Sequence, residues 1–315
     1  MAAKIAALLA LCALVPQDIP WKAKWSEALK EAKASKKLAI LVFFNKGVKD
    51  CKTFESDALA NSDVVSSLKQ HVCAKIDPEG PDEDNKLWQE HGAPRLPMTF
   101  VYDPEGKRLT EIGTINAKYY ASQLDAAGSA YFNKIVPARE SLAKDPNQPE
   151  KLAMLGEAYA QLNVGSESAG YYTKAVDLLE KKGDKEGALK ILESQLATYH
   201  GKKPRWNKES RAACKKIAEI DPSNQSKLRP FAAWVTAMAD CEERKWNDAI
   251  SSLGPAVNQY KESPLIDKMK FTLASAYMYS NDKAGAIRIF EDIVLTGKDE
   301  ETVNVARTQV EKLKK

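Results

Sequence analysis

Histidine and closely spaced cysteines are scarce in this chain. Its 315 residues include three histidines and five cysteines, and no two cysteines stand in a Cys-x-x-Cys arrangement. Few residues are therefore available for catalysis that depends on histidine, and a zinc site built from neighbouring Cys and His ligands has almost no support. We accordingly expect neither a metal site nor a cofactor.

An excess of one charge is also missing. The chain has 47 Lys and Arg against 43 Asp and Glu, which gives a formal net charge of +4. No basic run with interleaved aromatic residues occurs, so we expect no nucleic-acid partner. No stretch reaches the roughly 20 apolar residues that a membrane-spanning helix needs, so we expect no stable membrane span. The length favours two folded units, because single hydrophobic cores usually stop growing before this size.

The N-terminus carries the one leader-like segment. Lys4 precedes an apolar run over residues 5–15, and the chain then becomes polar. This run has the length of a signal-peptide core, so we predict a signal peptide over residues 1–15 and an exported, periplasmic or extracellular protein. Lipidation at Cys12 is an alternative, although Leu11 stands where a small residue is usual. A buried N-terminal helix is another, although the run has no polar face.

Periodicity over residues 20–130 predicts an α/β domain. The apolar run 38–44 has the length of a strand covered on both faces. The segments 71–77, 98–102 and 108–112 also indicate strands, and a turn at 103–106 joins the last two as a hairpin. Helices are expected over 21–34, 51–70, 86–91 and 117–127. Strand-helix-strand alternation indicates parallel pairing, to which the hairpin adds one antiparallel strand.

The segment KLAILVFFNKGVKDCKTFES, residues 37–56, supports this prediction. It resembles exported thioredoxin-like proteins, in which a strand is followed by Trp-Cys-x-x-Cys-Lys and, three residues on, Glu. Cys51 matches the second cysteine, Val48 stands at the first, and Gly47 stands at the tryptophan. The segment 95–100 resembles the family's cis-proline segment, and 103–107 resembles its hairpin. The resemblance covers most of residues 20–128.

The resemblance also implies what Val48 removes. In this fold the first cysteine lies at a helix N-terminus, where the helix dipole makes it the attacking thiolate, and the second cysteine resolves the mixed disulfide. Val48 cannot attack, so dithiol exchange is not expected and enzymatic activity is disfavoured. Cys51 is then an inert buried thiol, a disulfide partner, or a weak monothiol or redox sensor. Leu96 and Pro97, beside Val48, form an apolar shelf for an extended peptide, unless Pro97 only shapes its loop.

The remaining cysteines leave alternatives open. If the leader is removed, four cysteines remain, and an even number permits disulfides in an oxidising compartment without requiring them. Cys73 alternates along a predicted strand and is most simply a core residue. Cys214 and Cys241 lie on consecutive predicted helices and could form a bridge.

The chain becomes helical with short polar breaks after a connecting helix over 131–146. Residues 147–315 resemble tetratricopeptide repeats, whose units of about 34 residues place large and small side chains at fixed positions. The segments PEKLAMLGEAYAQLNVGSESAGYYTKAV, from residue 149, and MKFTLASAYMYSNDKAGAIRIFEDI, from residue 269, fit best. Two poorer units lie between them. The predicted fold class is thus an α/β thioredoxin-like N-terminal domain plus an all-α tetratricopeptide-type helical solenoid.

In such arrays the first helix of each unit lines a concave face. Here we predict a largely apolar face, and the alternative is that Trp234 and Phe271 pack under neighbouring helices. The residues at the corresponding positions are Phe231, Trp234, Met238 and Cys241 in the third unit, and Lys268, Phe271, Ser275 and Met278 in the fourth.

These features favour a non-enzymatic exported protein-binding or scaffold protein that takes a protein or extended peptide as partner. Its thioredoxin-like domain would be redox-inactive, and its helical domain would mediate the interaction. The alternative is a monothiol oxidoreductase or redox sensor that uses Cys51. A third hypothesis is an assembly factor in which the thioredoxin-like unit only caps the solenoid.

Overall fold

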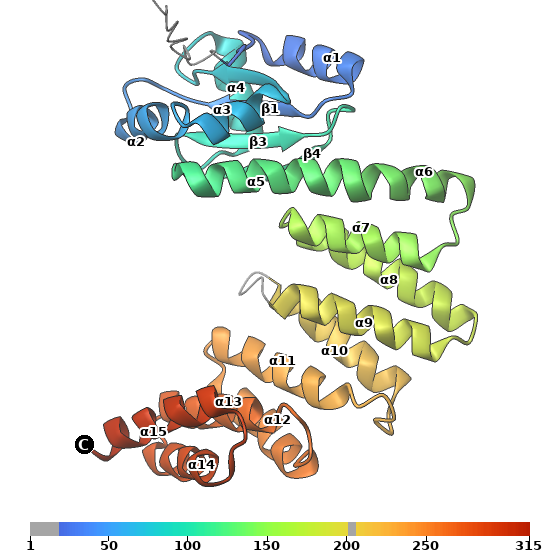
Figure 1. The fold of residues 1–315 in the computed structure, drawn as a ribbon, viewed down its shortest axis with the longest axis vertical. Coiled ribbons are helices and arrows are strands. Elements are labelled where there is room, and N and C mark those ends of the chain that lie inside the picture. The colour runs from blue at the N-terminus through green and yellow to red at the C-terminus, as the bar shows by residue number, and fades with distance from the viewer. Residues whose placement is uncertain (1–18, 201–205) are drawn as a thin grey trace, which may run out of the picture. The chain divides into compact units, whose positions relative to one another are not determined.

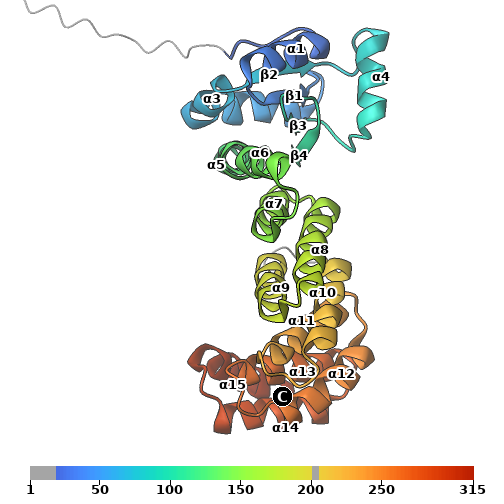
Figure 2. The same ribbon diagram turned by 90° about the vertical axis from the view of Figure 1, so that its right-hand side faces the viewer.

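The computed structural model describes residues 19–200 and 206–315, and the chain divides into two compact units, Met1–Phe132 and Asn133–Lys315 (Figures 1 and 2). Each unit is described by itself. The predicted signal peptide over residues 1–15, together with Cys12, lies outside the described residues.

The N-terminal unit contains a four-stranded mixed sheet with the strand order β2-β1-β3-β4. The strands are β1 (Ala39–Phe43), β2 (Val72–Ile76), β3 (Met98–Tyr102) and β4 (Arg108–Ile112). β1 pairs with β2 in parallel, whereas β1 with β3 and β3 with β4 are antiparallel. The expectation of parallel pairing is thus wrong for β3. Alternation of strands and helices does not reveal from which end of the sheet the chain enters the next strand, and here it enters β3 beside the end of β1.

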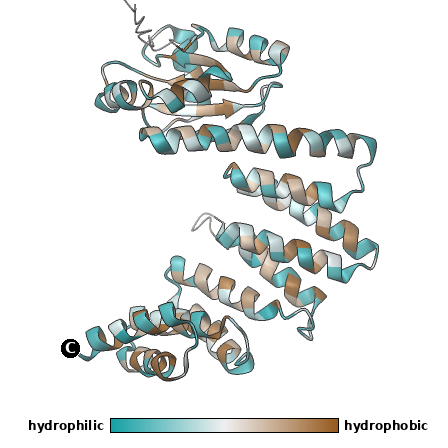
Figure 3. Cartoon of the chain, in the orientation of Figure 1, coloured by the Kyte–Doolittle hydropathy of each residue, from teal (hydrophilic) through white to brown (hydrophobic). Residues whose placement is uncertain are grey.

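Helices cover both faces of this sheet. Side chains that alternate along the strands, such as Leu41, Phe43 and Phe100, pack with α1 and α4 on one face. On the other face Thr99 shares a buried hydrogen bond of 2.9 Å with Tyr120 of α5. The strands are largely hydrophobic (Figure 3), as expected for a sheet covered on both sides. The helices are α1 (Trp25–Ser35), α2 (Lys49–Thr53), η1 (Phe54–Ala58), α3 (Ser62–Lys69), α4 (Asp82–His91) and α5 (Ala117–Ala130).

The single helix expected over residues 51–70 is interrupted. After α2 the chain makes one π-helical turn, η1, and α3 then starts anew. The Asn61 side chain caps α3 by accepting hydrogen bonds from the amides of Asp63 and Val64, at 3.0 and 3.3 Å. Asparagine is among the best N-cap residues because its oxygen satisfies amides that a helix start leaves unpaired. The new cap therefore divides the segment into two helices.

The second unit is helical throughout its described residues (Figures 1 and 2). η2 (Tyr131–Ile135) crosses the boundary in sequence, α6 (Val136–Lys144) follows, and the next eight helices form consecutive pairs. Each helix packs against the next, and α7 also contacts α9, as α11 contacts α13. The pairs are α7 (Pro149–Gln161) with α8 (Gly165–Lys181), α9 (Lys185–His200) with α10 (Asn207–Ile220), α11 (Arg229–Glu242) with α12 (Trp246–Gln259), and α13 (Ile266–Tyr279) with α14 (Lys283–Thr296), and α15 (Glu300–Lys314) ends the chain.

Three of these pairs share one internal turn. A residue with positive φ, namely Asn163, Arg244 or Asn281, follows the first helix. In each turn the next amide then donates back to a carbonyl in the last turn of that helix, at 2.8 to 2.9 Å. This is the Schellman arrangement, which satisfies carbonyls that a helix end leaves unpaired.

Small buried residues flank the same turn at matching positions. Seven residues before the positive-φ residue stand Gly156, Ala237 and Ala274, and five residues after it stand Ser168, Ala249 and Ala286. In the first pair the Ser168 hydroxyl donates to the Gly156 carbonyl at 2.6 Å. A Cβ atom on Gly156 would lie 2.7 Å from the ring of Tyr172. These residues let the two helices of a pair approach closely, so the units are structural repeats and not merely successive helices.

Candidate functional site

Three loops of the N-terminal unit meet at one end of the sheet. Phe43, the last residue of β1, lies opposite Ile76, the last residue of β2. It also lies opposite Met98, the first residue of β3. The segments that follow β1 and β2, and the segment that precedes β3, therefore lie at the same end. These segments contain Val48, the acidic loop after β2, and Leu96 with Pro97.

Val48 occupies the N-cap of α2. Its φ and ψ are −83° and 129°, and no side chain caps the helix there. The Val48 side chain is half-buried, and its amide donates to the Asn45 carbonyl at 3.1 Å. Backbone amides at a helix N-terminus stabilise negative charge. The position that would favour a thiolate therefore carries an aliphatic side chain that cannot ionise.

Cys51 lies in the first turn of α2 and is completely buried. Its Sγ accepts a hydrogen bond from the Asn45 amide at 3.4 Å. Burial raises the pKa of the Cys51 thiol, and the negative charges of Asp50, Asp77 and Glu55 raise it further, against the smaller opposing effect of the Asn45 hydrogen bond. Because the thiolate is the nucleophile, a protonated and buried thiol is poorly suited to exchange.

An amide and two carboxylates tie the loops after β1 and β2 together. The Asn45 side-chain amide donates to Asp77 Oδ1 and to Glu79 Oε2, both at 2.9 Å. Its Oδ1 accepts from the Gly47 amide at 2.7 Å. A Cβ atom on Gly47 would lie 2.8 Å from that oxygen, so the tryptophan that the resemblance places there would displace Asn45. Sequence reasoning missed this network, because its members lie in separate loops. The only local signal is a polar residue directly after a buried strand.

The loop before β3 is closely tied to the rest of the unit. The Leu96–Pro97 peptide bond is cis, as the resemblance implies. Pro97 is buried, and half-buried Leu96 packs on the sheet core. The Arg95 guanidinium donates to the Gly113 carbonyl, which follows β4. Part of the Leu96 side chain therefore remains on the surface at the same end of the sheet as Val48.

The described cysteines are all free thiols. The Cys73 thiol is buried in β2 and donates to the Leu68 carbonyl at 3.3 Å, and burial raises its pKa to about 12. Burial also raises the pKa values of Cys214 and Cys241 to about 11. The suggested bridge between Cys214 and Cys241 is therefore not formed, and all four thiols are protonated at neutral pH.

Trp234 belongs to a hydrophobic core cluster of the helical unit. Its side chain is 9% exposed, and its indole nitrogen donates to Thr272 Oγ1 at 2.9 Å. Trp234 and the core residues of α12 and α13 form one hydrophobic cluster. This is the packing under neighbouring helices that the alternative describes, and the place of Trp234 on the predicted concave face stays a prediction.

Of the other residues predicted for this face, Lys268 is exposed and the rest are half-buried. Phe271 lies against Phe290, with ring centroids 5.3 Å apart, and with Met278 it belongs to the cluster that includes residues of α15. The C-terminal helix therefore covers part of the fourth unit. Phe231 lies 6.2 Å from the Trp234 ring.

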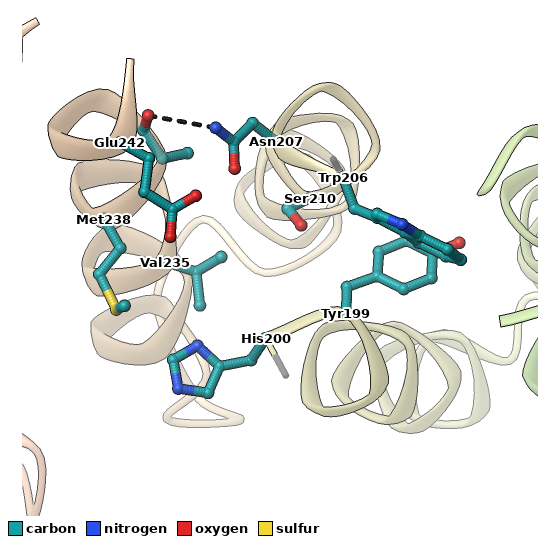
Figure 4. Close-up of a pocket in the computed structure, with 9 residues that line it drawn as sticks. Tyr199, His200, Trp206, Asn207, Ser210, Val235, Met238 and Glu242 are labelled. Carbon is teal, nitrogen blue, oxygen red and sulfur yellow. Dashed lines mark hydrogen bonds between the residues drawn. The ribbon is translucent and has the colours of Figure 1, made fainter. Parts of the chain in front are cut away.

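Met238 lines a small cavity between α9, α10 and α11 (Figure 4). The cavity measures about 20 Å³, which is close to the volume of one water molecule. In Figure 4 the Glu242 carboxylate and the His200 ring point into this space from α11 and from the end of α9. Its other labelled residues are Tyr199, Trp206, Asn207, Ser210 and Val235.

Two further classes of site are missing from residues 19–200 and 206–315. In that part of the chain no group of three or more His, Cys, Asp and Glu residues is placed to hold a metal ion. Nor does any helix there combine the length and the apolar character needed to cross a membrane.

Comparison with known proteins agrees with the fold of the first unit. A thioredoxin-like domain family matches residues 25–128. The solution structure of a thioredoxin from Thermus thermophilus is similar at 18% identity, over 33% of this chain and 82% of its own, with a TM-score of 0.31. A structure described as a DsbH oxidoreductase is similar at 20% identity, over 38% of this chain and 91% of its own, with a TM-score of 0.32. No curated protein matches.

The first unit is a thioredoxin-like domain with a mixed four-stranded sheet, and an all-α region of stacked helix pairs follows it. At this level the predicted fold class is confirmed.

Proposed function

We propose that this protein is a non-enzymatic, exported protein-binding or scaffold protein. Its thioredoxin-like domain is redox-inactive and its helical region is an interaction domain. The observation that carries the proposal is the fully buried, protonated Cys51, with Val48 where a nucleophile would stand. A thioredoxin-type reaction requires a thiolate at the helix N-terminus and a second thiol to release the substrate. This site supplies only a thiol in the second position.

The helical region is proposed to be a tetratricopeptide-type array. Its support is the shared turn, the flanking small residues, and the buried residues that follow at matching spacing. The second helices of three pairs place Tyr172, Leu253 and Phe290 nine residues after the positive-φ residue, and each is fully buried. Arrays of this kind present extended surfaces to partners, because each repeat contacts only its neighbours. We therefore assign protein or peptide binding to this unit.

A second contact surface is proposed at the end of the sheet. Val48 and Leu96 are both half-buried, and their loops lie at the same end because Phe43 is paired with Met98. Two partly exposed aliphatic side chains at this end of the sheet suit an extended apolar peptide segment. Export is proposed from the leader-like residues 1–15 alone.

The redox part of the proposal is tested by comparing the wild-type protein with Val48→Cys and Cys51→Ser variants in an insulin-reduction assay. We expect the wild-type protein and Cys51→Ser to share the same background rate. Val48→Cys recreates a dithiol at the start of α2, and its rate should exceed background by about ten-fold or more. Alkylation followed by mass analysis should find Cys51 protected in the native wild-type protein and reactive after denaturation.

The result that would reject the proposal is a wild-type reductase rate that Cys51→Ser abolishes. That result would establish the monothiol alternative, because Cys51 is the only cysteine in α2. Rapid alkylation of native Cys51 would count in the same direction.

A further inference from the structure

An open groove runs between α10 and α12 in the helical unit. Its volume is about 510 Å³. α10 packs on α8 and α11, and α12 packs on α11 and α13, whereas α10 and α12 share no comparable contact. The floor between them is α11, through Ala232, Ala233 and Thr236. These small side chains cannot fill the space between α10 and α12, so the groove results from the small residues on this face of α11.

The charges that line this groove are of one sign. Arg211, Lys215 and Arg229 line it, and no Asp or Glu does. The larger groove near Asp267 and Asp292, in contrast, is lined by acidic and basic residues together. The cavity shown in Figure 4 is far smaller.

Two of the three basic side chains have no acidic partner at close range in the described part of the chain, so their positive charge is available to a bound segment. Arg211 is offset by Asp240 at 2.5 Å and Glu243 at 2.9 Å. The Lys215 side chain is 82% exposed, and its contact with Glu219 is long, at 4.0 Å. Arg229 donates to the neutral carbonyl of Pro222 at 2.6 Å. A solvent-exposed ion pair at 4 Å contributes little, so Lys215 and Arg229 dominate the potential of the groove.

The wall formed by α12 contributes Ser252, Pro255, Ala256 and Gln259 to the groove. Pro255 lies inside this helix. Among the residues that this wall contributes, none is acidic, so none would oppose a negatively charged segment.

We infer that this groove binds an extended acidic peptide segment of a partner protein. Carboxylates of the segment meet Lys215 and Arg229, and its small side chains rest on the floor formed by Ala232 and Ala233. A single aromatic side chain, Tyr260, lines the groove, whereas single-stranded nucleic acids are held on successive aromatic platforms. The site lies on a different surface from the predicted concave face. The inference rests on the proposed role of the helical unit in binding.

The test uses the full chain and fluorescein-labelled peptides of about ten residues, a length typical of extended segments that bind in grooves. One peptide alternates Glu with Ala and the other alternates Lys with Ala, and binding is followed by fluorescence anisotropy. We expect the Glu-Ala peptide to bind more tightly, with an affinity that falls as salt rises. Lys215→Glu together with Arg229→Glu should weaken this binding by about ten-fold or more.

Three controls decide among surfaces. Lys215→Gln changes an exposed side chain that is not needed for folding, and it should weaken binding about three-fold. Lys268→Glu reverses an exposed charge on α13, at a position predicted for the concave face, and should leave the affinity unchanged. Ala233→Phe adds volume to the groove floor and should weaken binding without changing charge.

The inference is overturned if the two peptides bind equally, if Lys215→Gln and Ala233→Phe both bind as the wild-type protein does, or if Lys268→Glu alone abolishes binding. It is also overturned if a labelled oligothymidylate binds more tightly than the Glu-Ala peptide. The insulin-reduction assay depends only on Cys51, so failure of this inference and failure of the redox proposal are separate results.

Discussion

The aromatic pairs of the N-terminal unit join segments that are far apart in the sequence, whereas those of the helical unit join neighbouring helices. In the N-terminal unit, Phe54 of η1 packs against Tyr120 of α5, and Phe43 packs against Phe100 across the sheet. In the helical unit, Tyr172 meets Tyr199 and Phe271 meets Phe290, so each pair joins neighbouring helices. The first unit has contacts between distant segments, and the second adds its contacts repeat by repeat.

This difference explains where each unit leaves an open groove and where it does not. In the first unit the loops at the end of the sheet are joined by Asn45, Asp77 and Glu79, and Cys51 is buried beneath them in the first turn of α2. In the second unit, α10 and α12 pack on α11 far more than on each other and leave a groove between them. In the first unit, long-range contacts therefore bury the segment around Cys51. In the helical unit, a groove remains where the side chains of α11 are small.

The largest expected effect compares one core aromatic residue in each unit. Tyr120 and Phe290 are both fully buried, and replacing a buried aromatic residue by Ala costs about 4 kcal/mol. We expect Tyr120→Ala to raise hydrogen exchange throughout the sheet and α5. Phe290→Ala should raise it mainly in α13, α14 and α15. Exchange measured by mass spectrometry with peptide resolution checks both expectations.

An equal rise throughout the helical unit in Phe290→Ala would contradict the comparison. It would show that the repeats unfold as one cooperative body rather than repeat by repeat.

The next effect is a pH dependence of stability that we expect in the N-terminal unit, through His71. Burial lowers the pKa of His71 from 6.5 to about 4, although the negative charge of Asp125 opposes this effect, and Lys37 lowers the pKa slightly. His71 is 8% exposed, and its ring lies beside Gly128 of α5. As pH falls from 6.5 to 4, the unfolded chain gains a proton that the folded chain does not. The N-terminal unit should therefore lose up to about 3 kcal/mol over this interval.

His71→Leu removes this titration and is the matched variant. Its unfolding free energy should change less between pH 7 and pH 4 than that of the wild-type protein, as measured by urea denaturation at each pH. Parallel curves for the two proteins would show that His71 does not carry the pH dependence.

Continuous apolar runs made the strands predictable. The segments expected at 38–44 and 98–102 correspond to β1 and β3 within one residue at each end, because strands buried on both faces are largely apolar. Thr99 is the one polar residue of β3, and its hydroxyl is hydrogen-bonded to Tyr120. The direction of β3 was not predictable, because it depends on the path of the loop after α4. The break before α3 was missed although Asn61 is a recognisable cap.

The site was predictable only in part. Val48 and Cys51 were identified from spacing, since the motif is local. The Asn45 network was not, because Asp77 and Glu79 come from another loop and meet Asn45 only through the parallel pairing of β1 with β2. For Trp234 the sequence left two surroundings open, the concave face and packing under neighbouring helices, because a repeat pattern alone does not show which neighbour covers a residue. The groove had no sequence signal, because it depends on the packing of α10 and α12, which are not consecutive in the sequence.

The smallest expected effect tests whether close helix approach defines the repeats. Gly156 lies within α7, and a Cβ atom there would be 2.7 Å from the Tyr172 ring, so Gly156→Ala should destabilise the helical unit by about 2 kcal/mol. Gly170 lies within α8, and a Cβ atom there would meet nothing within 4 Å. Gly170→Ala should therefore stabilise it by up to about 1 kcal/mol, because alanine is the better helix former. Opposite signs in urea denaturation would show that packing between α7 and α8, and not helix propensity, determines the residue at Gly156. If both substitutions stabilise the protein, the ring of Tyr172 can move aside, and the small residues beside the turns are not what sets the spacing of the pairs.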